Sequence, residues 1–148
     1  MSAPGLRFSE INKSFGAAKV LHGVTFEIQR GAFFGLVGIN GAGKTTLLKC
    51  LLDFCTFDSG SIEIFGVAHH ARGARAKLAF LPERLNPPYY LTGEDFIQFT
   101  LEMQSVRYDR AAALDMMQAL DFDSAALTRP VRTYSKGMTQ KVGIAASL

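Results

Sequence analysis

The feature that most constrains the fold is a glycine-rich loop, GINGAGKTT, at residues 38–46. It fits the pattern G-x-x-x-x-G-K-[ST], with Gly38, Gly43, Lys44 and Thr45 at the fixed positions. Such a loop points successive backbone N–H groups into one concavity at the positive end of the following helix. The lysine can reach the β- and γ-phosphates, and the threonine hydroxyl can ligate a bridging magnesium ion. The loop predicts binding of a nucleoside triphosphate with magnesium and leaves the base open.

The residues on either side of the loop match the strand–loop–helix context that this motif requires. Residues 32–37, AFFGLV, are an apolar run that predicts a buried parallel strand. Residues 44–52 carry leucines at helical spacing. The alternative, a glycine-rich turn that binds nothing, gives Lys44 no reason to be there.

Composition narrows the class of protein further. The chain has 148 residues, of which 48% are hydrophobic and 20% charged, as in a globular protein of one domain or most of one. Its net charge is +3 with scattered basic residues, so nucleic-acid binding is not expected. Arg72, Arg75 and Lys77 form a loose basic cluster, which we interpret as a solvated surface rather than a phosphate or lipid contact. We find no secretory signal and no apolar run of about 18 residues that would span a membrane.

The cysteines and histidines do not have the spacing of a metal site. Cys50 and Cys55 are the only cysteines, and we interpret them as small buried hydrophobes in a reducing compartment. We expect His69 and His70 to be solvent-exposed loop residues.

Periodicity predicts strands in the first half of the chain and helices in the second. Alternating or short apolar runs predict strands at residues 6–11, 20–28, 61–66 and 77–82. Thr92 and Asp95 form a capping box ahead of a helix. Further helices are predicted at residues 109–120 and 124–127, and the proline pair in residues 86–90 predicts an extended connector.

A second candidate anion site lies in YSKGMTQK, residues 134–141. Ser135 and Gly137 precede a helical run that continues through Val142 to Leu148. A serine at a helix N-cap with exposed N–H groups behind it can bind an anion, but for this stretch alone a plain capped helix is the favoured interpretation.

Together these motifs resemble the nucleotide-binding domain of an ABC (ATP-binding cassette) transporter. GINGAGKTT is similar to the Walker A loop, YSKGMTQK to the family signature L-S-G-G-Q-x-Q-R, and FLPER, residues 80–84, to the Q-loop. The resemblance implies an α/β fold with a partial P-loop NTPase core, an antiparallel β subdomain and an α-helical signature subdomain. It places the β subdomain and P-loop core in residues 1–88 and the helical subdomain in residues 89–148.

The resemblance also implies roles for individual residues in nucleotide binding. Lys44 would bond the β/γ oxygens, Thr45 would hold magnesium, and Phe15 would stack on adenine, unless Phe15 is a core residue at a strand end. Glu83 stands where most members have glutamine, and could reach the magnesium ion or the attacking water. The implied nucleotide-binding set is Phe15, Asn40, Gly41, Ala42, Gly43, Lys44, Thr45 and Thr46.

In the family, two such domains pair head to tail, and each signature motif closes over the γ-phosphate held by its partner. The resemblance therefore implies an in-trans role for four residues, Ser135, Lys136, Gly137 and Met138. Lys136 and Met138 replace the glycine and glutamine of the common signature.

The largest departure from the family pattern is an absence. The family has a Walker B strand ending in Asp-Glu after the signature helix, and a switch histidine beyond it. The sequence stops at Leu148 within that helix, and His22, His69 and His70 lie too early. We therefore expect an N-terminal fragment of a longer ATPase, which binds nucleotide but hydrolyses it poorly or not at all.

The expected function is that of the ATP-binding subunit of an ABC transporter, with ATP and Mg²⁺ as cofactors. It would dock onto a membrane permease through its helical part and the Glu83 loop, in the cytoplasm at the inner face of the cell membrane. Two alternatives stay open: a soluble ABC-type ATPase without a permease, and a non-catalytic nucleotide-binding module.

Overall fold

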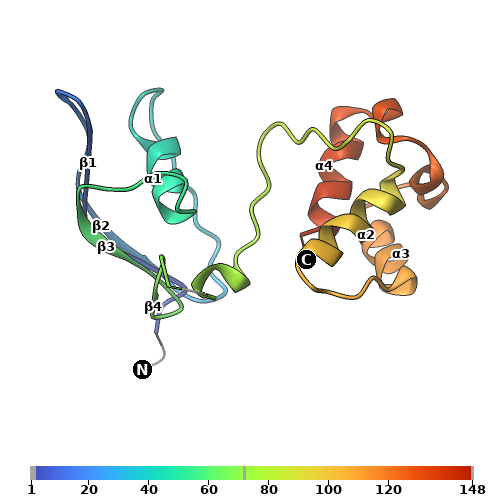
Figure 1. Ribbon diagram of the computed structural model, residues 1–148, viewed down its shortest axis with the longest axis horizontal. Helices are drawn as coiled ribbons and strands as arrows, with labels where there is room; N and C mark the ends of the chain where they lie inside the picture. Colours follow the sequence, from blue (N-terminus) through green and yellow to red (C-terminus); the bar gives the residue numbers. More distant parts are fainter. Residues whose placement is uncertain (1–2, 72, 148) are drawn as a thin grey trace. The chain divides into compact units, whose positions relative to one another are not determined.

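The computed structural model describes residues 3–71 and 73–147 and divides into two compact units, Met1–Leu78 and Ala79–Leu148 (Figure 1). Arg72 of the basic cluster and Leu148 of the last helical run lie outside the described residues. The subdivision into residues 1–88 and 89–148 stays a prediction about the family subdomains.

The first unit is built on an antiparallel sheet of four strands in the order β2-β1-β3-β4. The strands are β1 (Leu6–Phe15), β2 (Ala18–Ile28), β3 (Ser59–Ile64) and β4 (Val67–Ala68). Phe8 on β1 lies opposite Phe26 on β2 and Ile62 on β3, so apolar side chains line up across the sheet. The antiparallel β subdomain implied by the sequence is confirmed.

One glycine is required where β1 departs from regular pairing with β3. The register shifts after Ser9, and Glu10 adopts a φ of 51°. Gly60 on the facing strand has a φ of 106°, and a Cβ added to it would lie 2.5 Å from the backbone oxygens of Ser9 and Glu10. No side chain fits there without moving the backbone of β1.

The helix that follows the glycine-rich loop, α1 (Lys44–Leu51), packs its apolar side against the sheet (Figure 1). Its spacing buries Leu47 and Leu51 and leaves Leu48 44% exposed. The buried core of this unit consists of Phe8, Ile11, Leu21, Leu47, Cys50, Leu51, Ile62, Ile64 and Ala74.

Two of the predicted strands are wrong. Residues 32–37 form no strand, and Phe33 and Val37 are 107% and 92% exposed. Residues 77–82 are not a strand either: a short 3₁₀ helix, η1 (Ala74–Lys77), ends there and an irregular segment follows. A parallel strand is stable only when its backbone pairs with neighbours, and the single sheet of the described residues is formed by β1 to β4.

The expectation that His69 is a solvent-exposed residue is also wrong, whereas His70 is exposed. The backbone N–H of His69 donates to the Ile62 carbonyl, and its ring packs against Phe57. Burial lowers the pKa of His69, although Asp53, whose Oδ1 lies 3.8 Å from Nε2, acts in the opposite direction. His69 directly follows the two-residue edge strand β4, and its hydrogen bond to Ile62 continues the pairing of β4 with β3.

The second unit is helical, as predicted. It contains α2 (Gly93–Met103), α3 (Arg110–Ala119) and α4 (Lys136–Ala145), with short 3₁₀ helices η2 (Ser124–Thr128) and η3 (Val131–Thr133). Its buried core is centred on Ile97, Met117 and Val142, one residue from each α-helix. None of the helices in the described part of the chain is long and apolar enough to cross a membrane.

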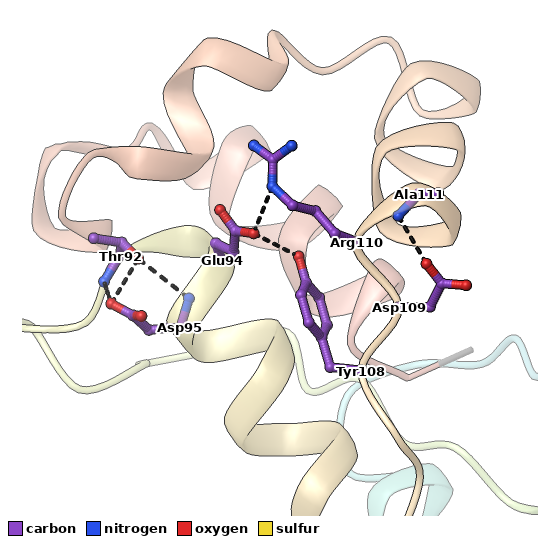
Figure 2. Close-up of polar contacts among 7 residues, drawn as sticks. All are labelled: Thr92, Glu94, Asp95, Tyr108, Asp109, Arg110 and Ala111. Carbon is purple, nitrogen blue, oxygen red and sulfur yellow. Dashed lines mark hydrogen bonds and ion pairs between the residues drawn. The ribbon is translucent and has the colours of Figure 1, made fainter.

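Side-chain caps fix where α2 and α3 begin (Figure 2). The predicted capping box is present: Thr92 Oγ1 accepts from the Asp95 N–H, and the Asp95 carboxylate accepts from the Thr92 N–H. Glu94 Oε1 then accepts from Tyr108 Oη at 2.8 Å and from Arg110 Nε at 3.0 Å. Burial and this contact raise the pKa of Tyr108 to about 12. Glu94 thus joins the beginnings of two helices.

Candidate nucleotide-binding loop and signature helix

The glycine-rich loop has the backbone conformation that its sequence predicts. Gly41 and Gly43 adopt φ angles of 85° and 84°, in the left-handed region that only glycine occupies without strain. A Cβ on Gly43 would lie 2.8 Å from Leu21 Cδ2 and 3.0 Å from the Val20 carbonyl oxygen, so the loop can approach β2 this closely only through glycine.

The first turn of α1 is open to a ligand. Gly43 is the N-cap of this helix and provides no side-chain hydrogen bond. The N–H groups at the start of a helix have no partner within the helix, and the macrodipole adds partial positive charge there. Thr45 is exposed and Thr46 half-buried in the same turn. These features suit a phosphate group.

Lys44 holds the loop together in this structure. Its Nζ donates to the carbonyl oxygens of Gly38 and Ile39, both at 2.7 Å, and the Ala42 N–H donates to the Ile39 carbonyl at 3.2 Å. The ammonium group therefore lies inside the curl of the loop. A phosphate entering the curl would meet one fixed positive charge and a set of backbone donors.

Phe15 lies at the end of β1 and is 54% exposed, so the alternative of a core phenylalanine is wrong. Lys13 Nζ lies 5.1 Å from the centre of its ring. An exposed ring with a cation on one side has a free face for stacking, and its stacking on adenine stays a prediction.

The signature residues form the beginning of α4. Ser135 is the N-cap, and its Oγ accepts from the Met138 N–H at 3.2 Å. Ser135, Lys136 and Gly137 are exposed, whereas Met138 is half-buried and packs against the core of the second unit. The serine cap is confirmed, and its contact with a partner's nucleotide stays a prediction.

Sequence reasoning missed how α4 holds the segment that carries Glu83. Gln140 Nε2 donates to the Glu83 carbonyl at 2.9 Å and to the Pro82 carbonyl at 3.3 Å. One turn further on, a Cβ on Gly143 would lie 2.5 Å from Leu85 Cδ2, so the helix touches this segment closely. Gln140 and Gly143 are three residues apart and therefore share one helix face, but this spacing does not indicate which segment they contact. The Glu83 side chain itself is exposed.

Within residues 3–71 and 73–147, no three side chains of His, Cys, Asp or Glu gather as a metal site would require. Magnesium that is held by a threonine hydroxyl and phosphate oxygens needs no such cluster. The donor set around Thr45 therefore fits magnesium only together with a nucleotide.

Comparison with known proteins supports these motifs. The family model described as ABC transporter matches residues 21–148. An uncharacterized ABC transporter ATP-binding protein, YdbJ of Bacillus subtilis, is 31% identical over 100% of this chain and 48% of its own length. The Nod factor export ATP-binding protein I of Ralstonia nicotianae is 32% identical over 99% of this chain and 47% of its own length.

Solved structures of ABC transporter ATP-binding proteins are similar to this chain. A putative ABC transporter ATP-binding protein from Pyrococcus furiosus superposes with a TM-score of 0.83 at 25% identity, covering 95% of this chain and 68% of that one. The dimeric structure of a bacterial ABC transporter cassette shares the fold, with a TM-score of 0.80 at 20% identity over 97% of this chain and 68% of that one.

The fold and the glycine-rich loop define the class as that of P-loop nucleoside triphosphatases, in a partial form. Within this class, the chain belongs to the ABC transporter ATP-binding family. It spans about half the length of the curated relatives it matches.

Proposed function

We propose that the chain is part of the ATP-binding subunit of an ABC transporter, which binds Mg-ATP to energise transport through a separate membrane permease. The observation that carries this proposal is the loop of residues 38–43 with two left-handed glycines and Lys44 inside its curl, directly ahead of α1. Family membership supports ATP as the nucleotide. One relative is named as an export ATP-binding protein, which supports a role in transport.

In this proposal, the phosphates are bound by the loop and the first turn of α1. Backbone N–H groups from Asn40 to Thr46 accommodate the phosphate oxygens, and Lys44 exchanges its carbonyl partners for the β- and γ-phosphates. Thr45 provides a hydroxyl ligand to magnesium, and Phe15 stacks on the adenine. Glu83 contributes a carboxylate toward the magnesium ion or the attacking water.

The proposed partners follow from the exposed beginning of α4. Ser135, Lys136 and Gly137 are accessible to a second nucleotide-binding domain, and Met138 supports them from the core side. We assign them to the γ-phosphate of a head-to-tail partner. The permease and a peripheral position at the inner face of the cell membrane belong to the same proposal.

We also propose that the 148-residue polypeptide on its own binds ATP without turning it over. Phosphoryl transfer requires carboxylates placed at the magnesium ion and the attacking water. None of the 13 acidic residues follows an apolar strand in the way such a carboxylate pair does in the family. This separates binding, which the loop provides, from hydrolysis.

The test is magnesium-dependent ATP binding and turnover by this polypeptide. We expect Lys44→Ala to weaken binding at least about tenfold, because hydrogen bonds to a charged group contribute roughly 1.5–3 kcal/mol. The matched control is Lys49→Ala, which removes an exposed lysine from the last turn of the same helix. Turnover at a rate typical of an intact ATPase, or equal binding by both variants, would contradict the proposal.

A further inference from the structure

The two cysteines of the chain touch each other. Cys50 Sγ and Cys55 Sγ lie 3.4 Å apart. Cys50 is fully buried in the last turn of α1, among Leu47, Leu51 and the sheet residues, whereas Cys55 is partly exposed. Nucleotide binding uses neither thiol.

The contact is held by the backbone. After α1, the chain reverses: the Phe54 and Cys55 N–H groups both donate to the Lys49 carbonyl, at 2.8 and 3.3 Å. Asp53 adopts a φ of 62° in this reversal, and its carboxylate accepts from Arg75 Nη1 at 2.9 Å. The turn thus carries Cys55 back onto the end of the helix, and the two sulfur atoms need to approach by only about 1.4 Å to reach bonding distance.

We propose that Cys50 and Cys55 form a redox-active dithiol, which a small disulfide oxidant such as glutathione disulfide converts into an intramolecular disulfide at the C-terminal end of α1. The Cys55 thiolate attacks one sulfur of the oxidant, forms a mixed disulfide and releases one glutathione thiolate. Cys50 then attacks Cys55 Sγ and releases the second. Two electrons pass from the protein to the oxidant, and the two thiol protons end on the two glutathione molecules.

The environments of the two thiols set this order of attack. Burial, followed by the contact with Cys55, raises the pKa of Cys50 to about 12, so Cys50 reacts poorly with an oxidant from solution. Cys55 is accessible and reacts first. The buried thiol is then close enough to resolve the mixed disulfide.

The cross-link would join the last turn of α1 to the segment that precedes β3. Cys50 lies six residues after Lys44, or about 9 Å along the helix axis. The modification therefore acts on the helix that carries the phosphate loop, at the end opposite to the loop.

The experiment exposes the reduced 148-residue polypeptide to glutathione disulfide, blocks residual thiols and maps both cysteines by mass spectrometry. We expect the wild type to lose both thiols together, retain no glutathione and recover both on reduction. Cys50→Ala should retain glutathione on Cys55. In Cys55→Ala, Cys50 should react at least about tenfold more slowly than Cys55 does.

A second measurement separates the folded geometry from mere closeness in sequence. In concentrated urea, the ratio of internal disulfide to mixed disulfide should be at least about tenfold lower than in the folded protein. The reason is that the turn that raises the effective concentration of the two thiols is lost. Wild-type protein that retains glutathione on Cys55, or an internal disulfide that forms equally well in urea, would overturn the proposal. Both of these outcomes are measured on wild-type protein, so the test does not depend on whether a variant folds.

Discussion

Asp95 shows how a single carboxylate makes the second unit sensitive to acid. The Thr92 hydroxyl and then its backbone N–H lower the pKa of Asp95 below its ordinary value of 3.8. A carboxylate with a lowered pKa in the folded state stabilises that state above its unfolded pKa, and the stabilisation is lost as pH falls through the folded pKa. The capping box should therefore weaken in acid.

We expect Asp95→Asn to lower the free energy of unfolding by roughly 0.5 kcal/mol at neutral pH, the usual contribution of a charge at a helix N-terminus. The deficit should shrink as pH falls from about 5 toward 2. All four tyrosines, Tyr89, Tyr90, Tyr108 and Tyr134, lie in the second unit, so tyrosine fluorescence in urea follows this unit. Asp115→Asn, at an exposed position within α3, is the control. A deficit that did not change with pH would contradict this assignment.

Individual residues were predictable from sequence where their environment is local. The Thr92–Asp95 box and the Ser135 cap depend on residues three apart, and both are present. His69 was not predictable, because the residues it contacts, Phe57 and Asp53, lie outside its own local segment. The same holds for Gln140, whose carbonyl partners lie more than 50 residues earlier in the chain.

At the level of elements, the pairing of β1 with β3 depends on one glycine. Gly60 combines a φ of 106° with close approach to two backbone oxygens, and these belong to β1 itself and cannot rotate away. Gly16, in the turn between β1 and β2, also has positive φ, 58°, but has nothing within 4 Å of an added Cβ. An added methyl group would therefore cause a steric clash and backbone strain at Gly60, but backbone strain alone at Gly16.

We expect Gly60→Ala to destabilise the first unit by about 3 kcal/mol or more, and Gly16→Ala by about 1 kcal/mol, the cost of a left-handed residue without a clash. Cys50 lies in the first unit and is fully buried. The rate at which this thiol reacts with a thiol reagent in increasing urea, followed by mass spectrometry, therefore reports the unfolding of the unit. Equal effects of the two substitutions would show that the backbone of β1 yields to the added methyl group.

Elements with local signals were predicted well. Alternation identified β1 to β3, and leucine spacing identified α1. The strand predicted at residues 32–37 is absent. Its apolar residues indicate only that the segment could be buried, whereas a parallel strand forms only if neighbouring strands pair with its backbone on both sides. The described residues provide none there.

On the scale of the whole molecule, this unpaired segment exposes apolar surface. Phe33, Val37 and Ile39 are 107%, 92% and 82% exposed. Phe34 is partly covered by stacking on Phe26, with ring centroids 5.2 Å apart, and Leu36 is 38% exposed. An exposed apolar run with high β-propensity is a site of association between chains.

We expect the 148-residue polypeptide to self-associate with increasing concentration, and Phe33→Lys to suppress this by placing a charge within the run. The control is Phe99→Lys, which makes the same change at a 49% exposed position on α2. Sedimentation velocity over a range of concentrations measures both. If wild-type protein stays monomeric throughout, or if the control suppresses association equally, the segment is not the cause.

The position of Lys44 has a consequence for which anions the loop can retain. The Lys44 ammonium group already donates to two peptide carbonyls at 2.7 Å. An incoming anion must displace these carbonyls, so its binding free energy from Lys44 is only the difference between the two sets of hydrogen bonds. Weak acceptors such as chloride gain little from this exchange. A terminal phosphate, with several charged oxygens, gains much more. In its proposed role the loop would therefore select against the abundant small anions that compete for the same positive charge.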